Sequence, residues 1–144
     1  MAISKENLLD LLNLDLSQEY RAIVQYTQHS GVMSGAAYNS IQKELIIHAG
    51  EELQHALLIA DQIDYLGGVP TIEVKPAQIS ADNDTMLRQD LEGENDAIKR
   101  YIARIKQAEQ LDLFHLAQKL REILAVEQEH AMDLENALGK NKGF

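Results

Sequence analysis

One sequence pattern occurs twice in the chain, and this duplication restricts the possible fold more than any other feature. In each copy, the motif Glu-x-x-Ala-Ile-x-x-Tyr is followed, after the same interval, by a second motif, Glu-x-x-His-Ala. The glutamate and histidine members are Glu19, Glu52 and His55 in the first copy and Glu94, Glu127 and His130 in the second. Residues three apart lie on one face of a helix, so each Glu-x-x-His pair can reach a common point. The chain is therefore expected to consist of two helical units of similar design.

Turn signals divide the chain into four helical segments. The only prolines, Pro70 and Pro76, fall in a single long connection, and apolar residues recur at helical spacing on either side of it. We expect helices at 4–30, 36–66, 83–107 and 111–138, with a crossover at 67–82. Short turns make antiparallel hairpins, and a connection this long can cross the length of a bundle. The sequence therefore predicts an all-α four-helix bundle, two hairpins joined by a long crossover, as one domain over residues 1–144.

Composition excludes several classes of protein. The chain has no cysteine, which excludes disulfides, thiolate catalysis and iron–sulfur clusters. Its formal net charge of −10 suits cations, and nucleic acid is not an expected partner because phosphate binding requires a basic surface. No apolar run approaches the roughly 20 residues that span a bilayer, and the segment MAISKENLLD has no basic and apolar signal-peptide pattern. A cytoplasmic protein without membrane contact is expected.

Packing the two hairpins together would bring four carboxylates and two imidazoles into the core. Buried carboxylates without counter-charge repel one another and are costly to desolvate. Two divalent cations would neutralise them, and this set of oxygen and nitrogen donors suits iron or manganese, with zinc as a further possible occupant. The duplicated pattern therefore predicts two nearly equivalent metal ions within one subunit.

The ligand pattern, helix lengths and crossover resemble the bacterioferritin-type members of the ferritin-like di-iron superfamily, over nearly all of residues 5–139. The resemblance implies that one iron is bound by Glu19 and His55, the other by Glu94 and His130, and both by the bridging Glu52 and Glu127. It also implies a tyrosine near the metals, for which Tyr26 is the candidate, although a core packing role for Tyr26 is equally open. We expect its counterpart Tyr101 to have a packing role.

Three features differ from the bacterioferritin pattern. Leu53 stands where bacterioferritins carry the haem-ligating methionine, so no haem is expected, and Leu53 should make an apolar contact instead. The chain ends shortly after Gly139, so we expect no fifth helix of the kind that lines the 24-subunit shell. Val126 stands where bacterioferritins often have an acid. A 12-subunit shell with the site inside each subunit, as in the Dps-like relatives of bacterioferritin, is favoured, and a dimer or a 24-subunit shell stays open.

The resemblance implies a ferroxidase, which oxidises Fe²⁺ with O₂ or H₂O₂ for iron storage or detoxification and relies on the bridging Glu52 and Glu127 for catalysis. The alternative is a di-iron or di-manganese redox enzyme that scavenges peroxide without a storage cavity. A non-catalytic helical scaffold would leave the core carboxylates unexplained.

Several polar side chains near the expected site lie outside the repeat. Glu51 is one of them, because its counterpart in the second copy is Val126. Glu44, His48 and Glu51 could form an outer iron route or a cavity-facing patch, but a solvated helix face is favoured. His29, close to the first turn, is expected at the surface.

Overall fold

A computed structural model describes residues 2–139 and shows an all-helical chain. Its elements are α1 (Lys5–Val32), the 3₁₀ turn η1 (Ala36–Tyr38), α2 (Asn39–Tyr65), α3 (Asn83–Gln110) and α4 (Phe114–Ala137). The described part of the chain contains no strand, and none of its helices is both long and apolar enough to cross a membrane. The predicted all-α four-helix bundle is confirmed. Residues 140–144, over which the sequence predicts no fifth helix, lie outside the described part.

Local sequence signals fix several helix ends. Ser4 caps the start of α1, where its hydroxyl accepts a hydrogen bond from the backbone N–H of Asn7 at 3.0 Å. Asp82 caps α3 in the same way and accepts from the backbone N–H of Thr85 at 2.9 Å. The chain leaves α2 through Gly67 at φ +91°, a left-handed conformation that glycine adopts without steric cost.

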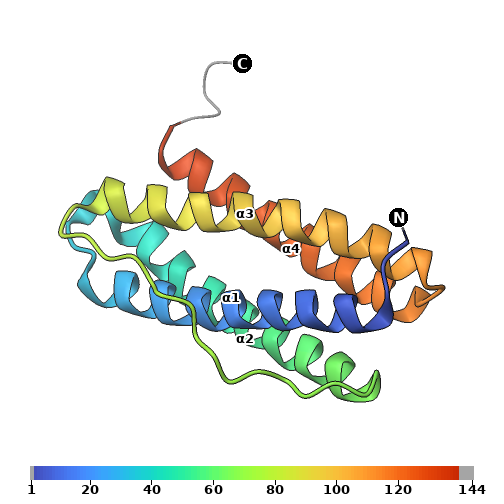
Figure 1. Cartoon of the computed structure of the whole chain (residues 1–144). Coiled ribbons are helices and arrows are strands. Elements are labelled where there is room, and N and C mark those ends of the chain that lie inside the picture. The colour runs from blue at the N-terminus through green and yellow to red at the C-terminus, as the bar shows by residue number, and fades with distance from the viewer. Residues whose placement is uncertain (1, 140–144) are drawn as a thin grey trace.

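The four helices form two antiparallel hairpins packed side by side (Figure 1). α1 packs along α2 and α3 along α4, while α1 also contacts α3 and α2 contacts α4. α2 and α3 run in the same direction, so the crossover between them returns along the whole length of the bundle, beside α1 (Figure 1). Hydrogen bonds hold this extended segment against α1: the Thr71 N–H donates to Asn13 Oδ1 at 2.8 Å, and the Gln78 N–H donates to Gln25 Oε1 at 3.0 Å.

Two apolar clusters fill the ends of the bundle and leave a polar layer between them. The cluster at the end formed by the α3–α4 turn includes Leu8, Leu12, Ile59, Ile63, Leu116 and Leu120, and the other includes Met33, Leu45, Met86, Leu87 and Leu134. On α1, Leu16 belongs to the first cluster and Ala22 to the second, with Glu19 between them. On α4, Ile123 and Ala131 flank Glu127 in the same manner, so each glutamate is held at mid-length of the core.

A buried ion-pair cluster joins α1 to α3 beside this layer. The Asp15 carboxylate is fully buried and accepts hydrogen bonds from Arg104 Nε at 2.7 Å, from Arg104 Nη2 at 3.2 Å and from Arg100 Nη1 at 2.7 Å. A carboxylate bound by two guanidinium groups has most of its desolvation cost offset by charge-assisted hydrogen bonds. The cluster therefore fixes how α1 and α3 lie against each other.

A second cluster occupies the position related to the first by the sequence repeat. Asp90 on α3 accepts from Gln25 Nε2 at 2.9 Å and lies 2.9 Å from His29 Nδ1, both on α1. His29 Nε2 lies 2.8 Å from the carbonyl oxygen of Gln78, so this histidine also anchors the crossover. The expectation that His29 lies at the surface is therefore wrong: its side chain is fully buried. Burial alone would lower the pKa of His29, but the hydrogen bond and charge of Asp90 outweigh burial and raise it.

Candidate metal centre

Each of the four helices contributes one carboxylate to the middle of the core. Glu-x-x-His on α2 and on α4 adds an imidazole on the same helix face, because residues three apart share a face. The six residues, each at most 6% exposed, are Glu19, Glu52, His55, Glu94, Glu127 and His130. The structure thus brings together all six residues that the repeat predicts.

Glu19, Glu52, His55 and Glu127 form one group of potential ligand atoms that lie within 4.8 Å of one another. His55 Nδ1 is at its centre, 3.1 Å from Glu52 Oε1, 3.5 Å from Glu127 Oε1 and 3.8 Å from Glu19 Oε2. This group can hold one metal ion.

Glu52, Glu94, Glu127 and His130 form a second group within the same limit. His130 Nδ1 lies 3.2 Å from Glu94 Oε2, 3.4 Å from Glu127 Oε1 and 3.8 Å from Glu52 Oε1. Glu52 and Glu127 belong to both groups, which is the arrangement that two carboxylates need in order to bridge a pair of ions.

Several buried polar atoms in the two groups have no hydrogen-bond partner among the described residues. These atoms are Glu19 Oε2, Glu52 Oε1, Glu127 Oε1 and Oε2, and His55 Nδ1. A buried polar atom without a partner costs about 1–3 kcal/mol, so a folded chain rarely keeps five of them in one place. Their convergence indicates a ligand that supplies the missing interactions. Divalent metal ions fit these oxygen and nitrogen donors, and the donor set contains no thiolate.

The carboxylates of the site do not all ionise freely. Burial raises the pKa of Glu52 well above its usual range, and the charge of Glu127 raises it further. Burial and the same neighbour raise the pKa of Glu94 to about 8. Burial also acts to raise the pKa of Glu127, but the adjacent His130 and His55 outweigh it and lower this pKa below its usual range. Of the two carboxylates shared by both groups, Glu52 is therefore the one that holds a proton more readily and Glu127 the one that ionises more readily.

The pKa values of the two histidines of the site are also raised. Burial alone would lower their pKa values. Glu127 and Glu19 outweigh burial at His55 and raise its pKa to about 10. Glu127 and Glu94 do the same at His130 and raise its pKa to about 11. Without metal, protons on both imidazoles, on Glu52 and, at pH values below about 8, on Glu94 thus offset much of the carboxylate charge. Metal ligation requires neutral imidazoles and ionised carboxylates, so metal binding must release these protons.

The two tyrosines of the repeat behave differently from each other. Tyr101 donates a short hydrogen bond from its hydroxyl to Glu19 Oε1, so the expected packing role is incomplete: Tyr101 also positions a potential ligand. The Tyr26 hydroxyl is buried without a hydrogen-bond partner among the described residues, and the ring meets His48 and His130 edge-on, with centroids 5.1 and 6.3 Å apart. The two halves of the site are therefore not equivalent.

Two further side chains that lie outside the repeat contact the site. Glu51 Oε1 lies 3.1 Å from His130 Nε2, the ring nitrogen on the side away from Glu94. His48 is fully buried and stacks on His130, with ring centroids 3.8 Å apart and an interplanar angle of 23°. The expected solvated helix face is therefore wrong for His48. Burial and the neighbouring His130 lower the pKa of His48 to about 4.

A signal for His48 was present in the sequence. Its counterpart in the second copy of the repeat is Ile123, a buried core residue, so the repeat itself assigns this position to the core. The expected apolar contact of Leu53 is not explained by the repeat: the residue is 46% exposed on α2 and belongs to neither apolar cluster of residues 2–139.

The comparisons with known proteins agree with this geometry. The model of the ferritin-like domain family matches residues 9–144. The chain is 29% identical to a bacterioferritin of Brucella melitensis over 131 residues (90% of this chain, 81% of the relative), and 27% identical to a bacterioferritin of Mycobacterium leprae over 133 residues (92% and 84%).

Two solved structures have the same fold. A ferritin-like, diiron-carboxylate protein of Bacillus anthracis superposes with a TM-score of 0.91 at 32% identity, over 96% of this chain and 99% of the other. A dodecameric thioferritin of Bacteroides fragilis, a bacterioferritin-related protein, gives a TM-score of 0.88 at 33% identity, over 95% and 87%. The matches to this fold and to bacterioferritins extend over nearly the whole chain, which therefore belongs to the ferritin-like family and is of the bacterioferritin type.

Proposed function

We propose that the chain is a cytoplasmic ferroxidase, a single ferritin-like domain over residues 1–144 that binds two iron ions and oxidises Fe²⁺ to Fe³⁺ with O₂ or H₂O₂. The purpose would be iron storage or detoxification in a 12-subunit assembly. The observation that carries the proposal is the set of converging, unpartnered oxygen and nitrogen atoms in the two overlapping groups. The family membership and the diiron-carboxylate neighbour favour iron as the metal.

In this proposal each residue has a defined task. Glu19 and His55 would hold one ion, Glu94 and His130 the other, and the two shared carboxylates, Glu52 and Glu127, would bridge them. The pair of irons supplies the electrons that reduce the oxidant. The shared carboxylates would hold both ions close together, so that one oxidant molecule could take electrons from both. Tyr101 keeps Glu19 oriented toward its ion through the hydroxyl hydrogen bond.

We also propose that the protein binds no haem. Leu53 has no sulfur donor at the position where bacterioferritins carry a haem-ligating methionine, and it lies on the outer face of α2. Purified protein, expressed with ample haem supply, is expected to lack a Soret band, and stoichiometric haem absorption would refute this part of the proposal.

A 12-subunit assembly is supported by the dodecameric neighbour from Bacteroides fragilis. The outer faces of α1 and α2 carry apolar side chains that the chain itself leaves exposed, among them Val24, Ile47, Leu53 and Leu57. Contacts between subunits would remove this surface from water. Native mass measurement tests the assembly directly.

The decisive kinetic experiment compares two neighbouring glutamates of α4. Glu127→Ala removes a bridging carboxylate, whereas Glu129→Ala removes an exposed one two residues further on. In stopped-flow mixing of Fe²⁺-loaded protein with O₂ or H₂O₂, Glu127→Ala is expected to lose fast oxidation by about 100-fold or more, since even outer partners of metal ligands can change activity by about 10–100-fold. Glu129→Ala should match the unaltered protein. Normal oxidation by Glu127→Ala would refute the proposed function.

A further inference from the structure

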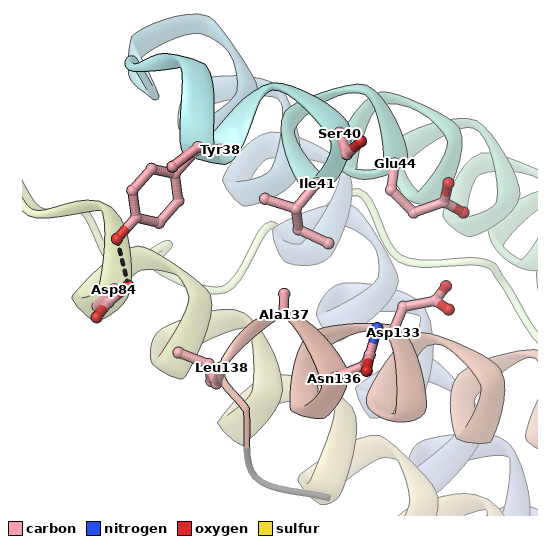
Figure 2. A pocket seen from close by; sticks show the side chains of 10 residues that line it. Tyr38, Ser40, Ile41, Glu44, Asp84, Asp133, Asn136, Ala137 and Leu138 are labelled. Atoms are coloured by element: carbon pink, nitrogen blue, oxygen red, sulfur yellow. Dashed lines mark hydrogen bonds between the residues drawn. The ribbon is translucent and has the colours of Figure 1, made fainter. Parts of the chain in front are cut away.

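A groove of about 610 Å³ lies between α2 and α4, at the end of the bundle away from the α3–α4 turn. Tyr38 and Leu138 line one part of it, and Glu44 of α2 and Asp133 of α4 line another. Figure 2 shows that the carboxylates of Glu44 and Asp133 project into the same space from opposite helices. Both side chains are about two-fifths exposed, at 39% and 43%, so they are accessible from solvent.

A fully buried histidine points at these two carboxylates from inside the core. His48 Nε2 lies 3.1 Å from Asp133 Oδ2 and 3.9 Å from Glu44 Oε1. Its other ring nitrogen, Nδ1, is buried and has no hydrogen-bond partner within residues 2–139. The unpartnered nitrogen is thus Nδ1, whereas Nε2, which lies within hydrogen-bond distance of Asp133, is the atom that faces the two acids at the groove.

We propose that Glu44, His48 and Asp133 form a third divalent-cation site, separate from the dinuclear centre. Carboxylate oxygens and imidazole nitrogens bind such ions at roughly 2.0–2.2 Å, so two ligands of one ion lie at most about 4.4 Å apart. Both distances from His48 Nε2 fall inside that limit. One ligand atom from each of the three residues lies within 4.8 Å of the others, a bound slightly wider than the spacing around a bound ion. Two carboxylates balance the charge of a divalent ion, and the donors suit Fe²⁺, Mn²⁺ or Zn²⁺.

The position of this site gives it a role in loading the dinuclear centre. His48 stacks on His130, which belongs to that centre, so one pair of rings separates the two sites. Asp133 and His130 are three residues apart on α4 and share a face. A cation bound at the groove would be separated from the paired ions only by the stacked rings of His48 and His130. This staging role rests on the ferroxidase proposed above, whereas cation binding at the groove does not.

Zinc is a suitable probe because it has no redox chemistry. Equilibrium binding of Zn²⁺ to metal-free protein is compared between unaltered protein, Glu44→Gln/Asp133→Asn, and the control Asp64→Asn/Glu129→Gln, which also removes one exposed acid from α2 and one from α4. The first double variant is expected to lose one Zn²⁺ per chain, and the control none. Equal stoichiometry in all three proteins overturns the proposal.

A zinc-soaked crystal of the unaltered protein decides the question without any variant. An anomalous peak bonded to Glu44, His48 and Asp133 is expected, and its absence when the dinuclear centre is filled overturns the proposal. Glu52→Ala/Glu127→Ala should lose the paired ions and keep the groove ion.

Failure of the third site can also be distinguished from failure of the proposed function. Glu44→Gln/Asp133→Asn is expected to oxidise Fe²⁺ about 10-fold more slowly at limiting Fe²⁺, with the saturated rate unchanged, because only loading is impaired. Normal oxidation by Glu127→Ala would refute the ferroxidase and leave the zinc result intact. An unchanged zinc stoichiometry would refute the groove site and leave the ferroxidase intact.

Discussion

Replacing Asp15 by alanine is expected to destabilise the metal-free bundle by about 3–5 kcal/mol, the usual cost of removing one partner from a buried ion pair. The fully buried carboxylate accepts three hydrogen bonds from two guanidinium groups. Arg104 is 4% exposed in the unaltered protein. Without the Asp15 carboxylate, it keeps only Gln107 as a hydrogen-bond partner among the described residues. Arg100 retains its pair with the more exposed Asp96. Most of the loss should therefore come from Arg104.

Urea unfolding followed by far-UV circular dichroism measures this loss, with all variants at equal subunit concentration because assembly adds stability. Asp96→Ala is the control: it breaks an exposed pair with Arg100 and should cost at most about 1 kcal/mol. If uncompensated charge is the cause, Asp15→Ala/Arg104→Met should be more stable than the sum of the two single changes implies. A stability of Asp15→Ala within about 0.5 kcal/mol of the unaltered protein would refute this reasoning.

Three other predictions concern protons and hydrogen bonds near the centre. The raised pKa of His29 means that its pair with Asp90 stabilises the fold fully below the unfolded-state value of about 6.5 and loses that contribution as the pH rises through the folded-state pKa. Asp90→Ala should therefore cost more in urea unfolding at about pH 5 than at pH 9, and a constant cost would contradict the assignment. Tyr101→Phe, which removes the hydroxyl bonded to Glu19, should weaken metal binding by about 10-fold in titration calorimetry. Tyr26→Phe removes a hydroxyl without a hydrogen-bond partner and should change affinity far less, so equal effects would be inconsistent with the geometry. Metal binding at pH 7 should release protons, because the pKa values of both histidines in the centre are raised far above 7. Calorimetry in buffers of different ionisation enthalpy measures this release. A binding enthalpy that does not depend on the buffer would mean that the two histidines were already neutral.

The bundle and the convergence of the six site residues could be predicted because both depend on local rules. Helical periodicity and turn residues locate the helices, and the Glu-x-x-His spacing places two side chains on one helix face. The sequence repeat then indicates that the second hairpin positions its glutamates and histidine as the first hairpin does. What the sequence did not reveal is set by contacts between helices: the hydrogen bond of Tyr101 to Glu19, the approach of Glu51 to His130 and the stacking of His48 all depend on helix rotation.

The sequence repeat contains a signal for some of the other buried polar contacts. Asp15 and Asp90 occupy equivalent positions in the two copies of the repeat, and so do their partners on the facing helices: Gln25 corresponds to Arg100, and His29 corresponds to Arg104. A buried acid with a polar partner in each half marks both positions as core. Glu51 has no such signal, because its counterpart Val126 carries no polar group.

The most direct test of the central claim is a crystal structure of the protein loaded anaerobically with Fe²⁺, with anomalous maps collected on both sides of the iron absorption edge. The account predicts two iron peaks within each subunit, both bonded to Glu52 and Glu127, one also bonded to Glu19 and His55 and the other to Glu94 and His130. Iron bound only between subunits, or the six side chains turned away from a common centre, would contradict it.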